Sequence, residues 1–318
     1  MIINNVKLIL DNEVVDGSIE IQDGTIRAFA ETQSRSPEAM DGDGGDRLEN
    51  LEKMINAVEE TQKRGLNRAE HRLHLRCELP HHTTLPLFEK LVGREPVSLV
   101  SLMDHSPGQR QFANIEKYRE YYQGKYSLSD AEMARYEEEQ LALAARWSQP
   151  NRVRIAAMCR DRNIALASHD DATHDHVLES HQLGSVIAEF PTTFEAAEAS
   201  RKHGMNVLMG APNIVRGGSH SGNVAASKLA SLGLLDILSS DYYPASLLDA
   251  AFRVADDEGN RFTLPQAIRL VTKNPASALN LQDRGEIAEG KRADLVLAHR
   301  RGEHVHIDHV WRQGKRVF

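Results

Sequence analysis

Apolar and polar residues alternate in short runs over the first thirty residues and the last forty. Near the N-terminus, the Asp23-Gly24 pair separates two such runs, which is typical of a β-hairpin. Similar runs lie near the C-terminus, at residues 293–297, 304–310 and 314–318. Because strands at both ends of a chain often complete one sheet, the pattern predicts a small composite β-sandwich domain from residues 1–36 and 282–318.

Between these ends the pattern changes to alternating strands and helices. A helix is predicted from Asp46 to Lys63, with one apolar stripe and Gly65 at its end. Six short apolar runs follow, separated by helical sequence, at residues 72–78, 96–105, 163–169, 184–190, 205–210 and 235–241. Repeated βα units predict a parallel sheet covered by helices. We therefore expect a (β/α) barrel domain over residues 46–281.

The number of strands falls short of a complete barrel. A (β/α)8 barrel has eight strands, whereas only six are recognisable here. Nothing between residues 30 and 70 has the pattern of a barrel strand. The predicted fold class is therefore α/β, an incomplete (β/α) barrel. A helical insertion from Ile115 to Trp147 is either a lid over a pocket or a peripheral helical hairpin.

Composition and charge narrow the class of protein. The 318 residues include 41% hydrophobic and 26% charged residues, as in globular proteins. The sequence has no run of 18 apolar residues, so no membrane span is predicted, and no secretory signal is recognisable. The net charge of −8 argues against general nucleic-acid binding but allows an anionic substrate. With only two, well-separated cysteines, we expect a cytoplasmic protein with neither nucleic-acid nor membrane partners. The sequence is compatible with a monomer and with a homo-oligomer.

Four of the six predicted strands end in a side chain that can bind a metal: Glu78, His105, His169 and Asp241. The active sites of (β/α) barrels gather at the C-terminal ends of strands, so we expect these four side chains to lie close together. Imidazole and carboxylate groups suit zinc, manganese or iron, and such an ion lowers the pKa of a bound water to roughly 7. Asp241 is then the catalytic carboxylate that takes the proton of that water, although it could instead merely cap the next helix.

Polar side chains on the first of these strands and in a later loop suit an anionic substrate. His74 and Arg76 share the face of their strand opposite to Leu75 and Cys77, so they are expected to point into the barrel. The glycine-rich run 210–223 follows a strand and offers further donors: Arg216, Ser219, His220 and Ser221. Glycines and arginine suit phosphate binding, but a glycine-rich loop without a ligand is the alternative. Neither Walker nor Rossmann glycine spacing is present.

The most specific motif lies near the C-terminus. It reads Thr272-x-Asn274-Pro-Ala-x-Ala-Leu-x-Leu, followed by Gly285-x-Ile-x-x-Gly290-x-x-Ala-Asp-Leu-Val. With this motif the chain resembles the amidohydrolase superfamily. The motifs R-L-H-L-R-C-E, A-S-H-D-D and G-A-P-N-I-V-R-G-G-S-H-S-G-N resemble one branch of it, which hydrolyses a triphosphorylated ribose phosphonate in phosphonate catabolism. The resemblance covers nearly the whole chain.

The resemblance implies a metal-dependent diphosphatase that releases pyrophosphate and leaves a ribose 5-phosphate. Glu78, His105, His169 and Asp241 would be its metal-binding and water-activating groups, and the loop from Arg216 to Asn223 would suit the polyphosphate. It also implies an H-x-H or H-x-D motif on the first barrel strand. This sequence lacks that motif, because Asp43-Gly44-Gly45 passes directly into the predicted helix. We therefore expect weakened metal binding and turnover.

Two other interpretations are compatible with the sequence. One is a different amidohydrolase activity, such as deacetylation or deamination, which would release acetate or ammonia. The other is a non-catalytic, truncated remnant that binds anions or a protein partner. The arginine in the glycine-rich loop favours a phosphorylated substrate.

Overall fold

The structure, a computed structural model, describes residues 2–9, 14–22, 25–30, 39–41, 47–219, 222–302 and 304–318. The chain divides into two compact units, Met1–Asn67 and Arg68–Phe318. Each unit is described by itself.

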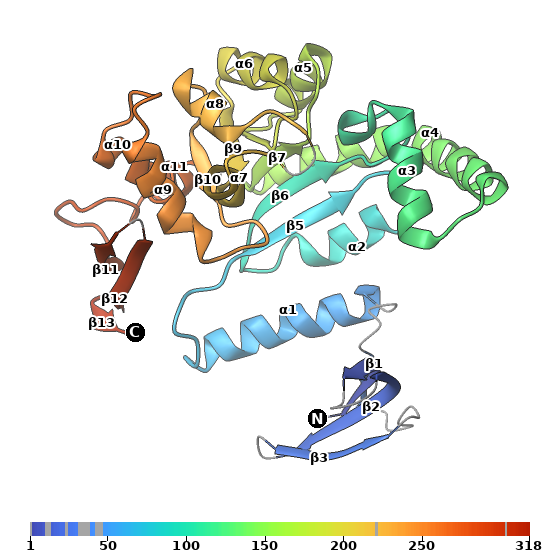
Figure 1. Ribbon diagram of the computed structural model, residues 1–318, viewed down its shortest axis with the longest axis horizontal. Coiled ribbons are helices and arrows are strands. Elements are labelled where there is room, and N and C mark those ends of the chain that lie inside the picture. The colour runs from blue at the N-terminus through green and yellow to red at the C-terminus, as the bar shows by residue number, and fades with distance from the viewer. Residues whose placement is uncertain are drawn as a thin grey trace. The chain divides into compact units, whose positions relative to one another are not determined.

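The first unit contains a four-stranded sheet and one helix (Figure 1). Its elements are β1 Ile2–Ile9, β2 Val14–Gln22, β3 Thr25–Ala30, β4 Ala39–Asp41 and α1 Arg47–Lys63. The sheet has the order β3-β2-β1-β4, with β1 and β4 parallel and the other pairs antiparallel. The predicted hairpin is confirmed, since Gln22 pairs with Thr25; Asp23 and Gly24 lie outside the described residues. The predicted helix is confirmed as α1, and Gly65 follows it with a φ of +66°.

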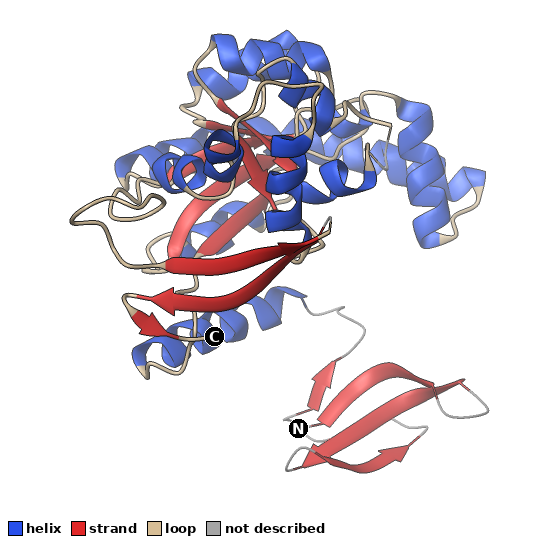
Figure 2. Ribbon diagram, turned by 60° about the vertical axis from the view of Figure 1, so that its left-hand side comes forward, coloured by secondary structure: helices blue, strands red, loops and turns tan. Residues whose placement is uncertain are grey.

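The second unit is built on a six-stranded parallel sheet with helices around it (Figures 1 and 2). The strands are β5 Leu73–Glu78, β6 Val97–Met103, β7 Ala165–His169, β8 Ile187–Glu189, β9 Asn206–Gly210 and β10 Ile237–Ser239. The helices are α2 Thr84–Leu91, η1 Arg110–Phe112, α3 Ile115–Tyr126, α4 Asp130–Asp161, α5 His174–Gln182, α6 Phe194–Lys202, α7 Ala211–Arg216, α8 Ala226–Ser231, α9 Ser246–Asp256, α10 Leu264–Arg269 and α11 Lys273–Ala278. All six predicted barrel strands are thus confirmed.

Alternation along the strands separates an inner layer from an outer one. Ala167, Ile187, Leu208 and Ile237 come from four different strands and form one buried cluster inside the curved sheet. Their strand neighbours, such as Val207 and Leu238, instead join a larger cluster with α7 to α10. Successive side chains on a strand point to opposite faces. His169, two residues after Ala167, therefore points to the inside at the end of β7.

The barrel is incomplete. Among the described residues, the hydrogen-bonded order is β10-β9-β8-β7-β6-β5, so β5 and β10 are the two edges of an open sheet. A closed barrel of this type has eight strands and no edges. Among the described residues ahead of β5, the strands β1 to β4 pair only with one another, and α1 is a helix; residues 31–38 and 42–46 lie outside the described part.

The helical insertion differs in one respect from its prediction. It consists of α3 and the first half of α4, but α4 continues through Pro150 to Asp161 as one helix of 32 residues. A capping box begins α4, with Ser129 and Glu132 bonded reciprocally. The second half of α4 buries Ile155, Ala156 and Cys159. This packing holds the helix together across the proline, although a proline removes one backbone hydrogen bond.

A three-stranded antiparallel sheet ends the chain. It comprises β11 Leu295–Arg301, β12 His304–Arg312 and β13 Lys315–Arg316. Arg300 pairs with Asp256 on α9, and the Val305 amide donates to Asp249 on the same helix, 2.8 Å away. The predicted strands at both chain ends are thus present. Their assembly into one composite domain stays a prediction. In the described part, no helix is both long and apolar enough to cross a membrane.

Glu70 contacts three arginines, two of which, Arg284 and Arg292, join the segment ahead of β5 to the C-terminal region. Its carboxylate contacts Arg72 at 2.6 Å, Arg284 at 3.2 Å and Arg292 at 2.5 Å. Burial alone would raise the pKa of Glu70, but hydrogen bonds from Arg292 and Arg284 lower it to about 2. A carboxyl group with a lowered pKa stabilises the fold at any pH above its unfolded value. The stabilisation disappears as the pH falls from about 4.5 to about 2.

Replacing Glu70 by glutamine is expected to lower the free energy of unfolding at pH 7 by about 2 kcal/mol, after allowance for solvent screening. The difference from the parent should shrink progressively below pH 4.5. Urea unfolding at pH 7, 4 and 3 measures it, with Glu258→Gln at an exposed position as the matched control. A deficit of equal size at pH 7 and pH 3 would contradict the linkage.

Candidate active site

A pocket of about 340 Å³ lies at the C-terminal ends of the parallel strands. Residues from the ends of all six strands and the loops after them line it, among them Arg76, His105, His169, Asp170, Phe190, Gly210, Arg216, Ser219 and Asp241. This is the end of the sheet where the active sites of (β/α) barrels lie. Three of the residues that follow these strands, Asp170, Phe190 and Asp241, have left-handed backbone with φ between 48° and 57°. Such strained backbone is concentrated at functional sites.

His105, His169 and Asp170 form the one cluster among the described residues whose side chains are close enough to hold a metal ion together. The ligand atoms of the three lie within 4.8 Å of one another. Oδ2 of Asp170 is 3.3 Å from Nε2 of His169 and 3.8 Å from Nε2 of His105. His169 and Asp170 are buried. Two imidazoles and a carboxylate are a usual ligand set for a catalytic divalent metal.

Each histidine of the cluster is oriented by a second carboxylate. Nδ1 of His105 lies 2.6 Å from Oε2 of Glu78, and Nδ1 of His169 lies 2.7 Å from Oε2 of Glu189. The amide of His105 also donates to Glu78, over 3.1 Å. A carboxylate on Nδ1 leaves Nε2 available for a metal and fixes the ring orientation. On this donor chemistry, the cluster fits a divalent ion held by His105, His169 and Asp170.

The Arg76 side chain points into the barrel as predicted and reaches the cluster. Its Nη2 lies 3.3 Å from Nε2 of His169, and its Nε lies 3.3 Å from the sulfur of Met103. A guanidinium can only donate, so Nε2 of His169 accepts this hydrogen bond. The hydrogen bond from Arg76 therefore engages the lone pair on Nε2 of His169 that a metal ion would use.

His105 is positively charged near neutral pH. Burial alone would lower the pKa of its imidazole, but the adjacent Asp170 and Glu78 carboxylates raise it to about 9. A histidine with a raised pKa stabilises the fold fully below its unfolded value of about 6.5. That stabilisation is lost as the pH rises from about 6.5 to about 9. A metal ion must displace the same proton.

The metal-free chain is therefore expected to lose about 2 kcal/mol of unfolding free energy between pH 6.5 and pH 9 through His105. Urea unfolding in the presence of a chelator, at both pH values, measures the loss. His105→Gln cannot carry the proton, so its free energy of unfolding should fall by correspondingly less over this interval. Equal falls in the parent and the variant would rule out the assignment.

The opposite wall of the pocket carries Asp241 and donors suited to an anion. Asp241 packs against Gly210: a Cβ atom at that glycine would lie 3.3 Å from Oδ2 of Asp241, tighter than most contacts of this kind. Nη1 of Arg216 donates to the hydroxyl of Tyr242, over 3.1 Å. Oδ1 of Asn213 accepts from the Ala226 amide, over 2.9 Å, and so holds the ends of the glycine-rich loop together. Arg216 and Ser219 both line the pocket.

The structure thus places six of the ten predicted site residues around one pocket: Arg76, His105, His169, Arg216, Ser219 and Asp241. Glu78 contacts the cluster through His105, and Asp241 lines the pocket outside the three-residue cluster. His74 lies deeper on β5, where Nε2 is 2.9 Å from the Ser101 hydroxyl and burial lowers the pKa of the imidazole. His220 and Ser221 lie outside the described residues. The metal and substrate assignments stay predictions.

Sequence reasoning missed Asp170 and Glu189. Glu189 ends β8, so the strand-end criterion that selected His169 would also have selected it. Asp170 follows His169 directly, but only its left-handed backbone, with a φ of 56°, brings its carboxylate back toward both histidines. The sequence therefore offered a usable strand-end signal for Glu189, whereas the position of the Asp170 carboxylate was visible only in the structure.

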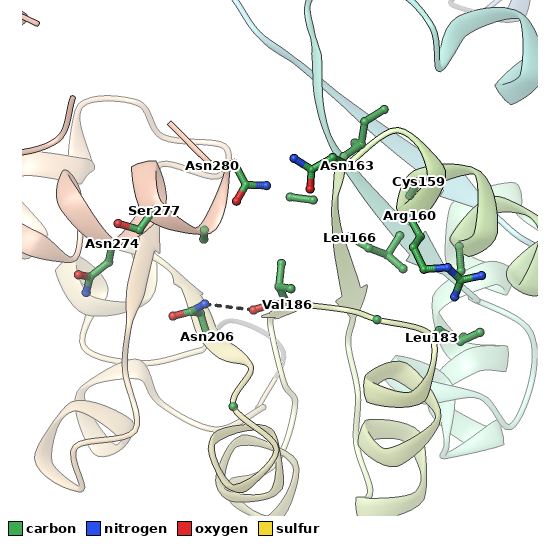
Figure 3. A pocket seen from close by; sticks show the side chains of 16 residues that line it. Cys159, Arg160, Asn163, Leu166, Leu183, Val186, Asn206, Asn274, Ser277 and Asn280 are labelled. Atoms are coloured by element: carbon green, nitrogen blue, oxygen red, sulfur yellow. Dashed lines mark hydrogen bonds between the residues drawn. The ribbon is translucent and has the colours of Figure 1, made fainter. Parts of the chain in front are cut away.

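A larger cavity of about 510 Å³ lies at the opposite end of the strands (Figure 3). Its lining includes Asn163, Asn206, Asn274 and Asn280, but no histidine or acidic residue. Asn206 is already bonded to the Val186 carbonyl, over 3.1 Å. Asn163 and Asn280 have left-handed backbone directly after α4 and α11, the usual role of asparagine beyond a helix C-terminus. This cavity therefore offers no catalytic chemistry.

Comparison with known proteins agrees with the fold and the cluster. A family model described as the amidohydrolase family matches residues 40–318. The chain belongs to this family of metal-dependent hydrolases. It is 74% identical to the alpha-D-ribose 1-methylphosphonate 5-triphosphate diphosphatase of Escherichia coli strain K12, in an alignment that covers 100% of both chains.

Two more distant similarities accompany this match. An adenine deaminase from Ligilactobacillus salivarius is 34% identical over 110 residues, which are 33% of this chain and 18% of the deaminase. A crystal structure of an amidohydrolase from Thermotoga maritima has a TM-score of 0.43 and 17% identity, covering 78% of this chain and 63% of that one.

The alignment with the E. coli relative also measures the gap in the barrel. It extends over 378 positions, whereas this chain has 318 residues, so about 60 positions of the relative have no counterpart here. A strand and its following helix take up roughly 30 residues in such folds. The gap therefore matches two βα units, the number by which the six-stranded sheet falls short of a barrel.

Proposed function

We propose that this chain hydrolyses alpha-D-ribose 1-methylphosphonate 5-triphosphate to the 5-phosphate and pyrophosphate, with a divalent zinc, manganese or iron ion. The proposal extends to this chain the activity for which its 74% identical relative is named. The observation that carries it is the composition of the pocket. A metal-binding cluster shares one cavity with Arg76 and Arg216, two cations suited to a polyphosphate.

The charge distribution of the pocket supports a polyphosphate substrate. Arg216 and Ser219 lie on the glycine-rich side, and Arg76 lies beside His169. A polyphosphate that spans the pocket would meet guanidinium groups on both sides. Because Arg76 contacts a proposed metal ligand, metal binding would free its guanidinium to turn toward the substrate. Deamination or deacetylation creates no comparable negative charge, so it gives no reason for two arginines.

The reaction adds one water across a phosphoanhydride bond, and a base must accept one proton of that water. A divalent ion bound by His105, His169 and Asp170 would supply Lewis acidity to the phosphoryl group and the water. Asp241 lines the same pocket and is the carboxylate to which we assign the proton. Glu78 and Glu189 keep the two imidazoles in place.

The test is to incubate the purified chain and Mn²⁺ with the triphosphate and to measure pyrophosphate, orthophosphate, ammonia and acetate. We expect pyrophosphate alone, in proportion to the triphosphate consumed. A parallel incubation with adenine and with acetylated substrates covers the deaminase and deacetylase alternatives. Release of ammonia or acetate without pyrophosphate would overturn the proposal. No product with any of these substrates would favour the non-catalytic alternative.

Arg216→Gln is expected to raise the KM for the triphosphate about tenfold, because one charge-assisted contact to phosphate is lost. The effect on kcat should be smaller. Steady-state pyrophosphate release measures both constants. Arg135→Gln, on the exposed side of α4, is the matched control and should change neither. An unchanged KM for Arg216→Gln would remove this residue from the phosphate site.

A further inference from the structure

A chain of ion pairs lies behind the candidate metal cluster. Arg110 follows β6 in the 3-10 helix η1, and its Nη1 lies 2.7 Å from Oδ1 of Asp171. Its Nη2 lies 3.0 Å from Oε2 of Glu179 on α5. Arg152 on α4 contacts the same Glu179 at 3.2 Å and Asp104 at 3.3 Å. Asp171, Arg110, Glu179, Arg152 and Asp104 are therefore linked without interruption, and we call them the ion-pair chain.

The two ends of the ion-pair chain adjoin the cluster. Asp171 directly follows Asp170, and Asp104 directly precedes His105. Each terminal carboxylate is also fixed by a hydroxyl: Ser180 donates to Asp171, over 3.1 Å, and Ser106 to Asp104, over 2.5 Å. The ion-pair chain thus connects the β6 and β7 ends on the side away from the pocket.

Burial of the ion-pair chain needs an explanation other than stability. The side chains of Arg110, Asp171, Arg152 and Asp104 are each at most 5% exposed. Buried ion pairs gain little net stability, because the desolvation of the charges offsets their attraction. Arg110 also has a left-handed backbone, with a φ of 43°, which is unfavourable for a residue with a side chain. The desolvation of the charges and the unfavourable backbone of Arg110 are both explained if the contacts fix the positions of neighbouring residues.

Arg110 is a member of the ion-pair chain that directly precedes a residue of the pocket wall. Its guanidinium bridges Asp171 and Glu179, and the two residues that follow it in the sequence face the site. Gln111 lines the pocket, and the ring of Phe112 packs edge-on against His105, with centroids 6.1 Å apart. A displacement of Arg110 would therefore move the metal cluster, the pocket wall and the aromatic contact together.

We propose that Arg110 is a positioning residue, which sets the distance between the β6 and β7 ligands of the metal through the ion-pair chain. This role rests on the proposed function, because it assumes that His105 and Asp170 bind one ion. It predicts that disturbing Arg110 weakens metal binding even where the fold keeps its stability.

The first test is Arg110→Lys in the 318-residue chain, titrated with Mn²⁺ and followed by electron paramagnetic resonance. A lysine keeps the positive charge, but its single ammonium cannot span Asp171 and Glu179 as the guanidinium fork does. We expect the Kd for Mn²⁺ to rise about 10- to 100-fold, as for other residues that orient metal ligands. The kcat for pyrophosphate release at saturating Mn²⁺ should fall while KM stays the same. Arg119→Lys breaks a comparable fork with Glu137 on α3 and α4, away from the site, and should change none of these values.

The second test removes the buried charges as a pair, in Arg110→Met with Asp171→Asn. This double variant leaves no unpaired Asp171 carboxylate, so we expect a Tm close to that of the parent together with the weakened Mn²⁺ binding. A Kd within twofold of the parent in both variants would overturn the proposal. Failure of both variants to fold would overturn it as well, since the ion-pair chain would then serve stability alone. If the parent released no pyrophosphate but Arg110→Lys still weakened Mn²⁺ binding, the proposed reaction would fail and the positioning role would stand.

Discussion

Restoring the missing part of the barrel is expected to raise the rate of pyrophosphate release at least about a hundredfold. In the restored protein, the roughly 60 positions that only the E. coli relative has would be inserted at Asp43-Gly44-Gly45, where the sequence pattern predicts the gap. The two added strands would pair with β5 and β10, which are now edges. Removing a metal ligand lowers affinity at least as much as removing a residue that orients one, and the latter costs 10- to 100-fold. The H-x-H or H-x-D motif that the resemblance implies is expected in this segment.

Three measurements check this expectation: kcat/KM, the Kd for Mn²⁺, and Tm with and without the metal. We expect all three to improve together, and the metal-dependent rise in Tm to be larger in the restored protein. The reverse change, deletion of the same positions from the E. coli relative, is the matched control and should lower the same quantities. A 318-residue chain with stoichiometric tight metal and turnover equal to the restored protein would show that the missing strands carry no ligand.

His169→Asn is expected to lower kcat/KM by about a thousandfold and to abolish tight metal binding in the restored protein. His169 connects more of the site than any other predicted residue. It faces Asp170 on Nε2 and Glu189 on Nδ1, and it is buried. Asparagine still offers a donor for Glu189, which limits the cost of leaving that buried carboxylate without a partner. It does not extend a ligand atom as far as Nε2, so the metal loses one of the three ligands proposed from the residues of the present chain.

Metal content after dialysis and steady-state pyrophosphate release measure this effect. His174→Ala is the control, because His174 is an exposed histidine five residues later, at the start of α5. It should keep both metal and activity. Retention of stoichiometric metal by His169→Asn would refute the assignment of this histidine as a ligand. A variant that keeps metal but loses turnover would instead reassign His169 to the substrate.

The strands of this protein were predictable from the sequence because their signal is local. Alternation places Leu75 and Cys77 on one side of β5 and Arg76 on the other, and the structure confirms this arrangement. The shortfall of two strands was also visible, because a barrel strand requires a run of apolar residues and none lies between residues 30 and 70. The family comparison then supplied the matching length, about 60 positions.

Roles within the site were not predictable in the same way. The sequence marks Glu78 and Asp170 equally well as carboxylates near a strand end. The parallel register brings the β5 end beside the β6 end, so Glu78 accepts from Nδ1 of His105. Asp170 instead reaches Nε2 of both histidines because its backbone is left-handed. A change of one backbone angle thus separates a proposed ligand from a residue that orients one.

The sequence by itself determined the repeated βα pattern, the strand ends that carry chemistry, the glycine-rich loop and the incomplete beginning of the barrel. Each of these depends on residues close together along the chain. The tertiary structure alone decided which strand-end groups share a ligand sphere, and it alone revealed the ion-pair chain. Arg110 lies 61 residues from Asp171 and 69 from Glu179 in the sequence. No local pattern records such a contact, because it arises only when the loops after β6 and β7 meet above a common sheet.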